Sequence, residues 1–341
     1  MGILREQVFE VPVISIGNIT VGGTGKTPHT EYLVTFFMKN FKVAVLSRGY
    51  KRRTKGFLLA GETTPANDIG DEPKQIKTKF PGISVAVDEK RAEGIEKLLQ
   101  LSDKPGMVLL DDAFQHRYVK PGLSVLLIDY NQPPEKDFLL PAGRLRESFS
   151  GKKRAHIMVV SKCPPDLKPI EKRIITTNLN LLAFQRVFFT AIAYQQPIPV
   201  FSTLQGVNLP FLKDFTQTDV LLVTGIAQPK QLLGYLQPLA SSVKHFSYAD
   251  HHFFSAKEIY RLVNDFKQLE SPRKIILTTE KDAIRLREAP DVIPLLDLPI
   301  YYLPVGIQFL FDEEEQFKQL VMSYIDKNET ITSKLVTGKT R

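Results

Sequence analysis

The sequence contains no tryptophan and only one cysteine, Cys163, among its 341 residues. A single cysteine excludes an intrachain disulfide and fits a reducing compartment. Cys163 stands in Ser-Lys-Cys-Pro-Pro, where we expect an unreactive thiol at the end of a strand. No apolar run approaches the ~18–20 residues that a membrane span needs, and no secretory signal is recognisable. We therefore expect neither a disulfide-stabilised secreted protein nor a membrane-spanning one.

The charged and aromatic residues narrow the class of partner. The formal net charge is +8, which favours anionic partners such as a nucleotide, a nucleic acid or acidic lipid headgroups. The 22 Phe and 11 Tyr are scattered without the spacing of a base-stacking platform, so nucleic acid is not a predicted partner. The densest basic run, 51–53, is either part of such an anion site or a solvated loop.

Apolar segments alternate with amphipathic ones along most of the chain, which predicts an α/β protein. Strands that are apolar throughout indicate a mostly parallel sheet covered by helices on both faces. The length fits about two domains of ~100–200 residues, and a proline-containing linker near 195–199 separates them. We expect domains at 1–195 and 196–326 and a polar, disordered tail at 327–341. The expected strands are 11–19, 43–50, 57–60, 83–87, 106–112, 124–129, 156–161, 187–194, 220–224, 243–248, 274–279 and 300–305; the expected helices are 26–39, 71–80, 90–101, 228–237, 255–269, 280–287 and 312–325.

Residues 13–28 have the order strand, glycine-rich turn and Lys-Thr at a helix start. In such a phosphate loop, backbone N–H groups and the helix N-terminus bind phosphate oxygens. The lysine reaches the β- and γ-phosphates and the threonine offers its hydroxyl to Mg²⁺. The strict motif has glycine where this chain has Thr20, and the alternative is a glycine-rich turn with no ligand. The predicted phosphate-binding residues are Thr20, Val21, Gly22, Gly23, Thr24, Gly25, Lys26 and Thr27.

Asp111 and Asp112 end an apolar strand, in the place where open α/β sheets hold Mg²⁺ or its water. The alternative is a pair of acids that cap a loop or helix. Gln115 and His116 follow directly, and the histidine is either a phosphate or metal-shell contact or a surface loop residue.

A second group of charged residues follows a glycine turn at residues 140–147. Arg144 and Arg146 suit bidentate binding of phosphate, and Glu147 could join a Mg²⁺ shell. The alternative is a salt bridge at a helix start.

Two more polar segments lie in the second half of the chain. Residues 250–253 contain adjacent histidines, which cannot both face one metal from a regular strand, so we do not expect a zinc site there. One of them could orient a carboxylate base. Residues 278–282 are expected to cap a helix.

Together these segments resemble one family, tetraacyldisaccharide 4'-kinase, the lipid A 4'-kinase. The Asp-Asp-x-Phe-Gln-His and Leu-x-x-x-Gly-Arg-x-Arg-Glu patterns are much more specific than the phosphate loop. One departure is Ala113, which stands where the family has glycine, so this position must avoid positive φ. The matching stretches run in the family's order and are 17–28, 46–50, 70–73, 111–116, 140–147, 250–252 and 278–282.

The resemblance implies a P-loop NTPase-like kinase domain and a smaller C-terminal α/β domain that closes the cleft. It implies transfer of the γ-phosphate of ATP to the 4'-hydroxyl of a tetraacylated glucosamine disaccharide 1-phosphate, giving lipid IVA in lipid A (lipopolysaccharide) biosynthesis of Gram-negative bacteria. The implied cofactors are ATP and Mg²⁺. The implied partners are this anionic acylated lipid and the inner-membrane surface, on whose cytoplasmic face the protein is peripheral. No obligate protein partner is inferred.

The resemblance also implies roles for individual residues. Asp71 resembles the general base and His251 its orienting partner, while Lys26 and Arg146 neutralise phosphate charge. Arg48 and His116 would contact substrate or phosphate. The implied metal ligands are Thr27, Asp111, Asp112, Glu147 and Gln115.

Two other functions remain open from the residues alone. One is a P-loop kinase or ATPase acting on a soluble acceptor, and the other is a nucleotide-switched binding protein. The switch class requires neither the segment 140–147 nor a second domain, so both features favour a kinase.

Overall fold

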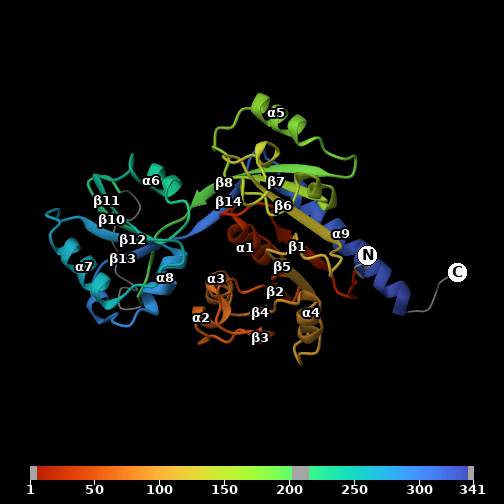
Figure 1. Cartoon of the computed structure of the whole chain (residues 1–341), viewed down its shortest axis with the longest axis horizontal. Helices are drawn as coiled ribbons and strands as arrows, with labels where there is room; N and C mark the ends of the chain where they lie inside the picture. Colours follow the sequence, from red (N-terminus) through yellow and green to blue (C-terminus); the bar gives the residue numbers. More distant parts are fainter. Residues whose placement is uncertain (1–5, 202–214, 337–341) are drawn as a thin grey trace. The chain divides into compact units, whose positions relative to one another are not determined.

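The structure, a computed structural model, describes residues 6–201 and 215–336. The chain divides into two compact units (Figure 1). The first unit contains residues 1–193 and 306–341, and the second contains residues 194–305. Each unit is an α/β structure with its own sheet and its own buried cores.

The first unit is built on a nine-stranded sheet in the order β14-β8-β7-β6-β1-β5-β2-β4-β3. The pairs β1–β5, β1–β6, β2–β5, β2–β4, β6–β7 and β7–β8 are parallel, and the edge pair β3–β4 is antiparallel. The mostly parallel sheet predicted from the apolar runs is therefore present. Its strands are β1 (Val13–Gly17), β2 (Val43–Ser47), β3 (Leu58–Leu59), β4 (Ser84–Val87), β5 (Met107–Asp111), β6 (Leu123–Asp129), β7 (Ile157–Ser161), β8 (Arg186–Tyr194) and β14 (Val305–Phe309).

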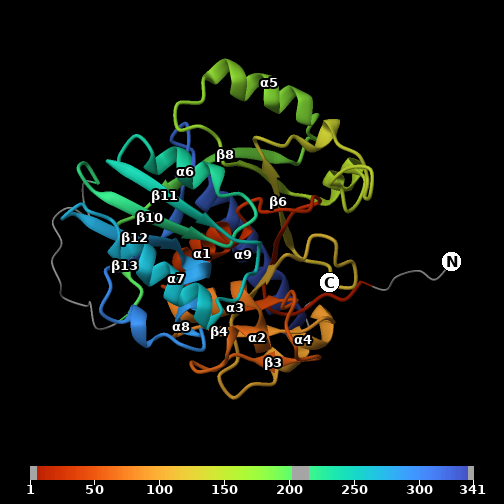
Figure 2. The same ribbon diagram turned by 60° about the vertical axis from the view of Figure 1, so that its left-hand side comes forward.

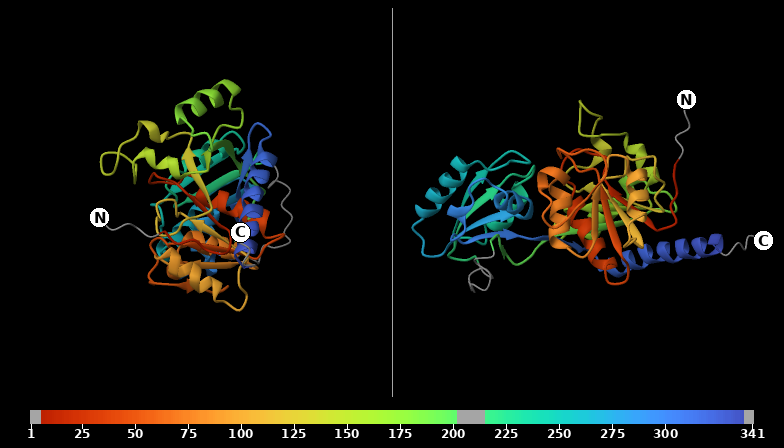
Figure 3. Two further views of the ribbon diagram at one scale, coloured as in Figure 1. Left: turned by 90° about the vertical axis from the view of Figure 1, so that its right-hand side faces the viewer. Right: turned by 90° about the horizontal axis from the view of Figure 1, so that it is seen from below.

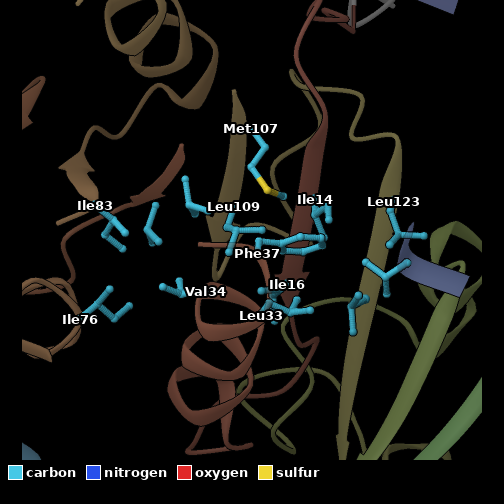
Figure 4. Packing of buried hydrophobic residues seen from close by; sticks show 14 of the residues in the cluster. Ile14, Ile16, Leu33, Val34, Phe37, Ile76, Ile83, Met107, Leu109 and Leu123 are labelled. Carbon is cyan, nitrogen blue, oxygen red and sulfur yellow. The ribbon is translucent and has the colours of Figure 1, made fainter. Parts of the chain in front are cut away.

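Helices cover both faces of this sheet because alternate strand residues point to opposite sides. Ile14 and Ile16 of β1 pack with α1, α3 and α9 on one face, as Figure 4 shows for α1. Residues on the other face, such as Leu126 of β6 and Leu110 of β5, pack with α4 or α5. The helical segments of this unit are α1 (Lys26–Phe37), α2 (Ala66–Ile69), α3 (Asp71–Lys79), α4 (Arg91–Leu99), α5 (Pro169–Leu179), α9 (Glu314–Val336), η1 (Pro134–Lys136) and η2 (Phe149–Arg154).

The second unit has a five-stranded sheet in the order β11-β10-β12-β13-β9. Figure 2 labels four of these strands, β11, β10, β12 and β13. Leu221 and Val223 of β10 face α7 and α8, whereas Val220 and Leu222 face α6. The alternation again buries both faces of the sheet. The elements are β9 (Ile198–Pro199), β10 (Asp219–Thr224), β11 (Ser242–Ser247), β12 (Lys274–Thr279), β13 (Ile300–Leu303), α6 (Lys230–Leu236), α7 (Ala256–Lys267), α8 (Glu280–Arg287) and η5 (Ile293–Leu295).

The predicted boundary of the second domain at residue 326 is wrong. The chain leaves the first unit at the end of β8 and returns at β14, which is the neighbour of β8 in the sheet. Helix α9 then packs on the first unit through Phe317, Val321 and Ile325 (Figure 3). The sequence shows that α9 is amphipathic but not which core it covers.

The predicted tail also begins too early. Helix α9 continues to Val336, so only residues 337–341 of that tail lie outside the described residues. The predicted linker contains β9, which pairs antiparallel with β13. Helix α5 was not expected from the sequence. Within residues 6–201 and 215–336, no helix has both the length and the apolar character needed to cross a membrane.

Candidate active site

The predicted site residues of the first unit follow strands that are neighbours in the sheet. Ile16 of β1 is in register with Asp111 of β5, and Ser47 of β2 is in register with Val87 of β4. Because these strands are parallel, the loops that follow them meet at one edge of the sheet, where ligands bind in open α/β folds.

The loop after β1 has the geometry that phosphate binding requires. Gly22 and Gly25 adopt φ of 102° and 81°, a conformation that other residues rarely take. Helix α1 begins at Lys26 with Gly25 as its N-cap, and no side chain caps the helix. The first backbone N–H groups of α1 therefore remain for an anion. Thr27 lies in this first turn, as the motif predicts.

Asn18 organises this loop, although the sequence reasoning gave it no role. It is fully buried and donates from Nδ2 to Thr24 Oγ1 at 2.9 Å. Its Oδ1 accepts from Lys26 Nζ at 3.4 Å and from Arg146. One amide thus joins the loop, the lysine and the arginine. The available signal was a polar residue between a buried strand and a glycine-rich turn.

Asp111, the last residue of β5, and Asp112, which follows it, have different environments. Asp111 is 4% exposed and accepts a hydrogen bond from Thr30 Oγ1 at 3.0 Å. Burial and the neighbouring Asp112 raise the pKa of Asp111 to about 6. Burial alone would also raise the pKa of Asp112, but Lys26 and Arg146 lower it below the usual value. Asp112 is therefore the acid held as a carboxylate by cations.

The cations around Asp112 come from two different segments. Lys26 Nζ lies 3.6 Å from Asp112 Oδ1, and Arg146 binds both carboxylate oxygens at 3.0 and 3.4 Å. Asp112 itself adopts φ of 48°, whereas Ala113 is not among the residues with positive φ. The prediction that Ala113 avoids positive φ is confirmed.

A second group of basic residues lies at the same edge of the sheet. Arg91, at the start of α4, is 3% exposed and donates from Nη1 to Asp88 O at 3.0 Å. Burial lowers the pKa of Arg91 to about 10, with Asp112 opposing and Arg48 adding to the shift. Burial, Arg91 and Arg48 also lower the pKa of His116. The predicted residues Arg48 and His116 thus share one electrostatic environment with Arg91, which the sequence reasoning missed.

Asp71 is the first residue of α3 and is 4% exposed. A carboxylate at this position is stabilised by the partial positive charge of a helix N-terminus. Glu31 of α1 binds two residues of α3. Its carboxylate accepts hydrogen bonds from Gln75 Nε2 at 2.7 Å and from Lys79 Nζ at 2.6 Å. The helices that begin at Lys26 and Asp71 are therefore held together by a buried carboxylate.

The segment at 140–147 lies against the phosphate loop. Val21 N donates to Arg144 O and Arg146 N donates to Ile19 O, both at 2.8 Å. This pairing brings Arg146 to Asp112. Both oxygens of Glu147 accept from Arg154 Nη2, at 2.7 and 2.8 Å, so Glu147 forms a salt bridge with the last residue of η2 and not one at a helix start. Its role as a metal ligand stays a prediction, as does that of the partly exposed Gln115.

His251 belongs to the second unit, in the loop after β11. The expected helix cap is confirmed at the start of α8, where Thr279 accepts from the backbone N–H of Asp282.

The residues at this edge suit Mg²⁺ only in company with other ligands. Among residues 6–201 and 215–336, no three His, Cys, Asp or Glu side chains gather as a metal site. Mg²⁺ characteristically takes one or two carboxylates and completes its shell with water and substrate phosphates. The side-chain oxygens of Asp111, Asp112 and Thr27 match this coordination preference. A phosphate loop beside two acids and three arginines has the chemistry of phosphoryl transfer.

Known proteins are similar to this chain in both sequence and fold. Residues 1–326 match the family model described as tetraacyldisaccharide-1-P 4'-kinase. The chain is 49% identical over 333 residues to the tetraacyldisaccharide 4'-kinase of Bacteroides thetaiotaomicron, covering 96% of this chain and 88% of that protein. It is 46% identical over 329 residues to that of Phocaeicola vulgatus, covering 96% and 89%. The crystal structure of the "apo" form of LpxK from Aquifex aeolicus in complex with ATP matches with a TM-score of 0.69 and 29% identity, covering 94% of this chain and 91% of that chain.

Proposed function

The chain belongs to the tetraacyldisaccharide-1-P 4'-kinase family, and we propose that it transfers the γ-phosphate of ATP to the 4'-hydroxyl of a tetraacylated glucosamine disaccharide 1-phosphate. The product would be lipid IVA, a precursor of lipid A. The observation that carries the proposal is the Lys26–Asp112–Arg146 cluster beside a phosphate loop. The first unit is the nucleotide-binding domain in this proposal.

Catalysis would rest on positioning and on charge neutralisation. Lys26 and Arg146 flank Asp112 and would turn to the phosphates of bound ATP, together with the N–H groups of residues 20–25. Arg48, Arg91 and His116 lie on the same edge of the sheet and would hold further phosphate charge. When bound, Mg²⁺ would be held by Thr27, Asp111 and Asp112, and it would neutralise charge on the transferred phosphoryl group.

Asp71 is the proposed general base. Its carboxylate would take the proton of the sugar hydroxyl as the new P–O bond forms and ADP leaves. The burial of Asp71 and its fixed place at the start of α3 support this role, because a base must be held at its reacting proton. His251, which belongs to the second unit, is the other residue proposed to assist this proton transfer.

We further propose that the protein is peripheral on the cytoplasmic face of the inner membrane, since an acylated substrate resides in a lipid phase. A loop beside the phosphate loop exposes three consecutive apolar side chains, Phe138, Leu139 and Leu140, which are 69%, 52% and 51% exposed. Asp137 fixes the base of this apolar loop by accepting from Phe138 N and from the backbone and side chain of Arg144, at 2.8–3.1 Å. A loop held in this way can present apolar side chains to lipid.

The function is tested by measuring ATP turnover with and without a tetraacylated disaccharide 1-phosphate. We expect ³²P from [γ-³²P]ATP to appear in the lipid, and turnover to depend on that acceptor. Lys26→Ala should lower transfer by at least ~10²-fold because it removes a phosphate-binding charge. The fold, measured by circular dichroism, should be unchanged. Lys104→Ala, at an exposed lysine outside the site, is the matched control.

Other results would identify the alternatives. Hydrolysis that is independent of the acceptor would indicate a nucleotide-switched binding protein. Transfer only to a water-soluble alcohol would indicate a kinase for a soluble acceptor. Full transfer by Lys26→Ala would contradict the assignment of the phosphate loop.

A further inference from the structure

The second unit contains a buried ion pair that packing alone does not explain. The side chains of Asp282 and Arg285 on α8 have no exposed surface, and Arg285 Nη1 lies 3.1 Å from Asp282 Oδ1. Removing two charges from water costs as much as their attraction returns, so a buried pair is weak evidence for stability. The contacts of the Arg285 guanidinium with other groups are therefore of interest.

Both residues of the ion pair form hydrogen bonds with the loop that follows β10. Asp282 Oδ2 accepts from Gly225 N at 2.9 Å, and Arg285 Nη1 donates to Gly225 O at 3.0 Å. The same carbonyl accepts from His251 N at 3.3 Å. The backbone of His251 and the guanidinium of Arg285 are thus anchored to one peptide group.

His251 is held in a conformation that costs energy. Its φ of 66° lies in the left-handed region, which few residues other than glycine adopt, and its side chain is only 9% exposed. Backbone strain of this kind persists where surrounding contacts enforce it. Here these contacts include the anchor at Gly225 and the side chain of Arg285.

The contact between the two side chains fixes the proton of the imidazole. Arg285 Nη2 lies 3.3 Å from His251 Nδ1. A guanidinium donates hydrogen bonds and cannot accept them, so Nδ1 must be the acceptor. A neutral imidazole with an unprotonated Nδ1 carries its proton on Nε2. Asp250 also faces the ring, and its Oδ2 lies 3.6 Å from Nε2.

The neighbouring histidine, His252, contacts residues other than His251 and Arg285 in the same part of the unit. His252 stacks on Tyr248, with ring centroids 4.5 Å apart, and its Nε2 lies 3.0 Å from Glu258 Oε1. Glu258 also caps α7 through Ser255. His252 therefore provides a matched control for His251.

We propose that Arg285 is a positioning residue whose buried guanidinium fixes His251 as the neutral tautomer with its proton on Nε2. The inference rests on the proposed function in one respect, the catalytic role assigned to His251. The contact with Arg285 leaves Nε2–H as the hydrogen-bond donor that the His251 ring can offer.

The tautomer is tested on the full-length protein labelled with ¹⁵N-histidine, using long-range ¹H–¹⁵N correlation spectra. The signal of His251 is assigned by its loss in His251→Gln. We expect an unprotonated Nδ1 and a protonated Nε2 in the wild type. Arg285→Lys keeps a buried charge but loses the guanidinium fork, so a mixture of tautomers is expected. A proton on Nδ1 in the wild type would overturn the proposal.

Kinetics test whether Arg285 acts through His251. Arg285→Lys should lower kcat by on the order of 10²-fold, the cost of a misplaced catalytic group, with the KM for ATP unchanged. In the His251→Gln background the same substitution should have no further effect on kcat, whereas additive losses would overturn the proposal. His252→Gln should leave the tautomer and the coupling unchanged.

Two further measurements separate the possible failures. Arg285→Met, which removes the charge, should also give a mixture of tautomers. If this variant does not fold, as judged by amide hydrogen exchange, the spectra of Arg285→Lys still decide the tautomer. If His251→Gln retains full kcat, the proposed catalytic role of His251 is wrong. The spectra then still decide whether Arg285 fixes the imidazole.

Discussion

At the scale of single residues, the arrangement of the site depends on side chains that bind more than one partner. Asn18 joins Thr24, Lys26 and Arg146, and Asp112 joins the same two cations. In the proposed mechanism, phosphates of ATP would replace the amide and the carboxylate as partners of these cations. Cys163 illustrates the opposite case. It is 2% exposed and its pKa is raised to about 12 by burial, which agrees with the expected unreactive thiol.

Asp71→Asn should separate catalysis from binding. An asparagine keeps the size of the side chain but cannot take a proton, so kcat should fall by ~10²–10⁴-fold. The dissociation constant for ATP should change little, because the phosphate loop is intact. Both are measured with purified enzyme, by transfer to the acylated disaccharide and by calorimetry.

The control for this substitution is Asp103→Asn, at an acid whose side chain is 76% exposed and pairs with Lys42 on the surface. It should leave both constants unchanged. Equal losses of kcat and of ATP affinity in Asp71→Asn would assign Asp71 to binding and not to proton transfer.

At the scale of secondary-structure elements, α9 shows how a segment can belong to a core that is distant in sequence. Its apolar residues complete the face of the sheet that α1 and α3 leave partly covered. Tyr32 of α1 donates to Glu314 at 3.0 Å, and Tyr324 donates to Val13 O at 3.4 Å. The last helix therefore closes the same core that supports the phosphate loop.

Ile325→Ala should destabilise the first unit by about 2–5 kcal/mol, because it leaves a cavity at a fully buried position. Amide hydrogen exchange can locate this loss. Protection should fall in β1 and β8 and should be retained in β10 and β12. The matched control is Ser323→Ala, at an exposed residue of the same helix, which should change stability little. A loss confined to β10 and β12 would place α9 with the second unit.

At the scale of the whole molecule, a net charge of +8 and the exposed apolar loop at residues 138–140 would act together on an anionic lipid surface. Electrostatic attraction is screened by salt, whereas the burial of apolar side chains is not. Binding to a membrane surface would then have a salt-dependent part from charge and a salt-resistant part from the apolar loop.

Vesicles containing phosphatidylglycerol test this proposal by cosedimentation. Affinity should fall as salt rises. Phe138→Gln combined with Leu139→Gln should reduce it by at least ~10-fold at any salt concentration, since each buried apolar side chain contributes about 1.5–3 kcal/mol. The matched control is Ile170→Gln with Ile174→Gln, two residues that are 61% and 53% exposed on α5. Loss of binding in the control alone would assign the lipid contact to α5.

The sequence by itself determined the alternation of strands and helices, the phosphate loop, the acids after β5 and the family. These features are local, because strand and turn residues occur in a fixed order and place each side chain at the end of an element. Even the conformation expected at Ala113 followed from the chemistry of one residue.

Only the tertiary structure decided which charges meet and which core each helix covers. Arg146 reaches Asp112 from another segment because residues 19–21 pair with residues 144–146, and Arg285 reaches His251 because both bind Gly225. Helix α9 joins the first unit because β14 lies beside β8. Such contacts depend on the packing of distant segments, and an amphipathic pattern states that a face is buried but not which partner buries it.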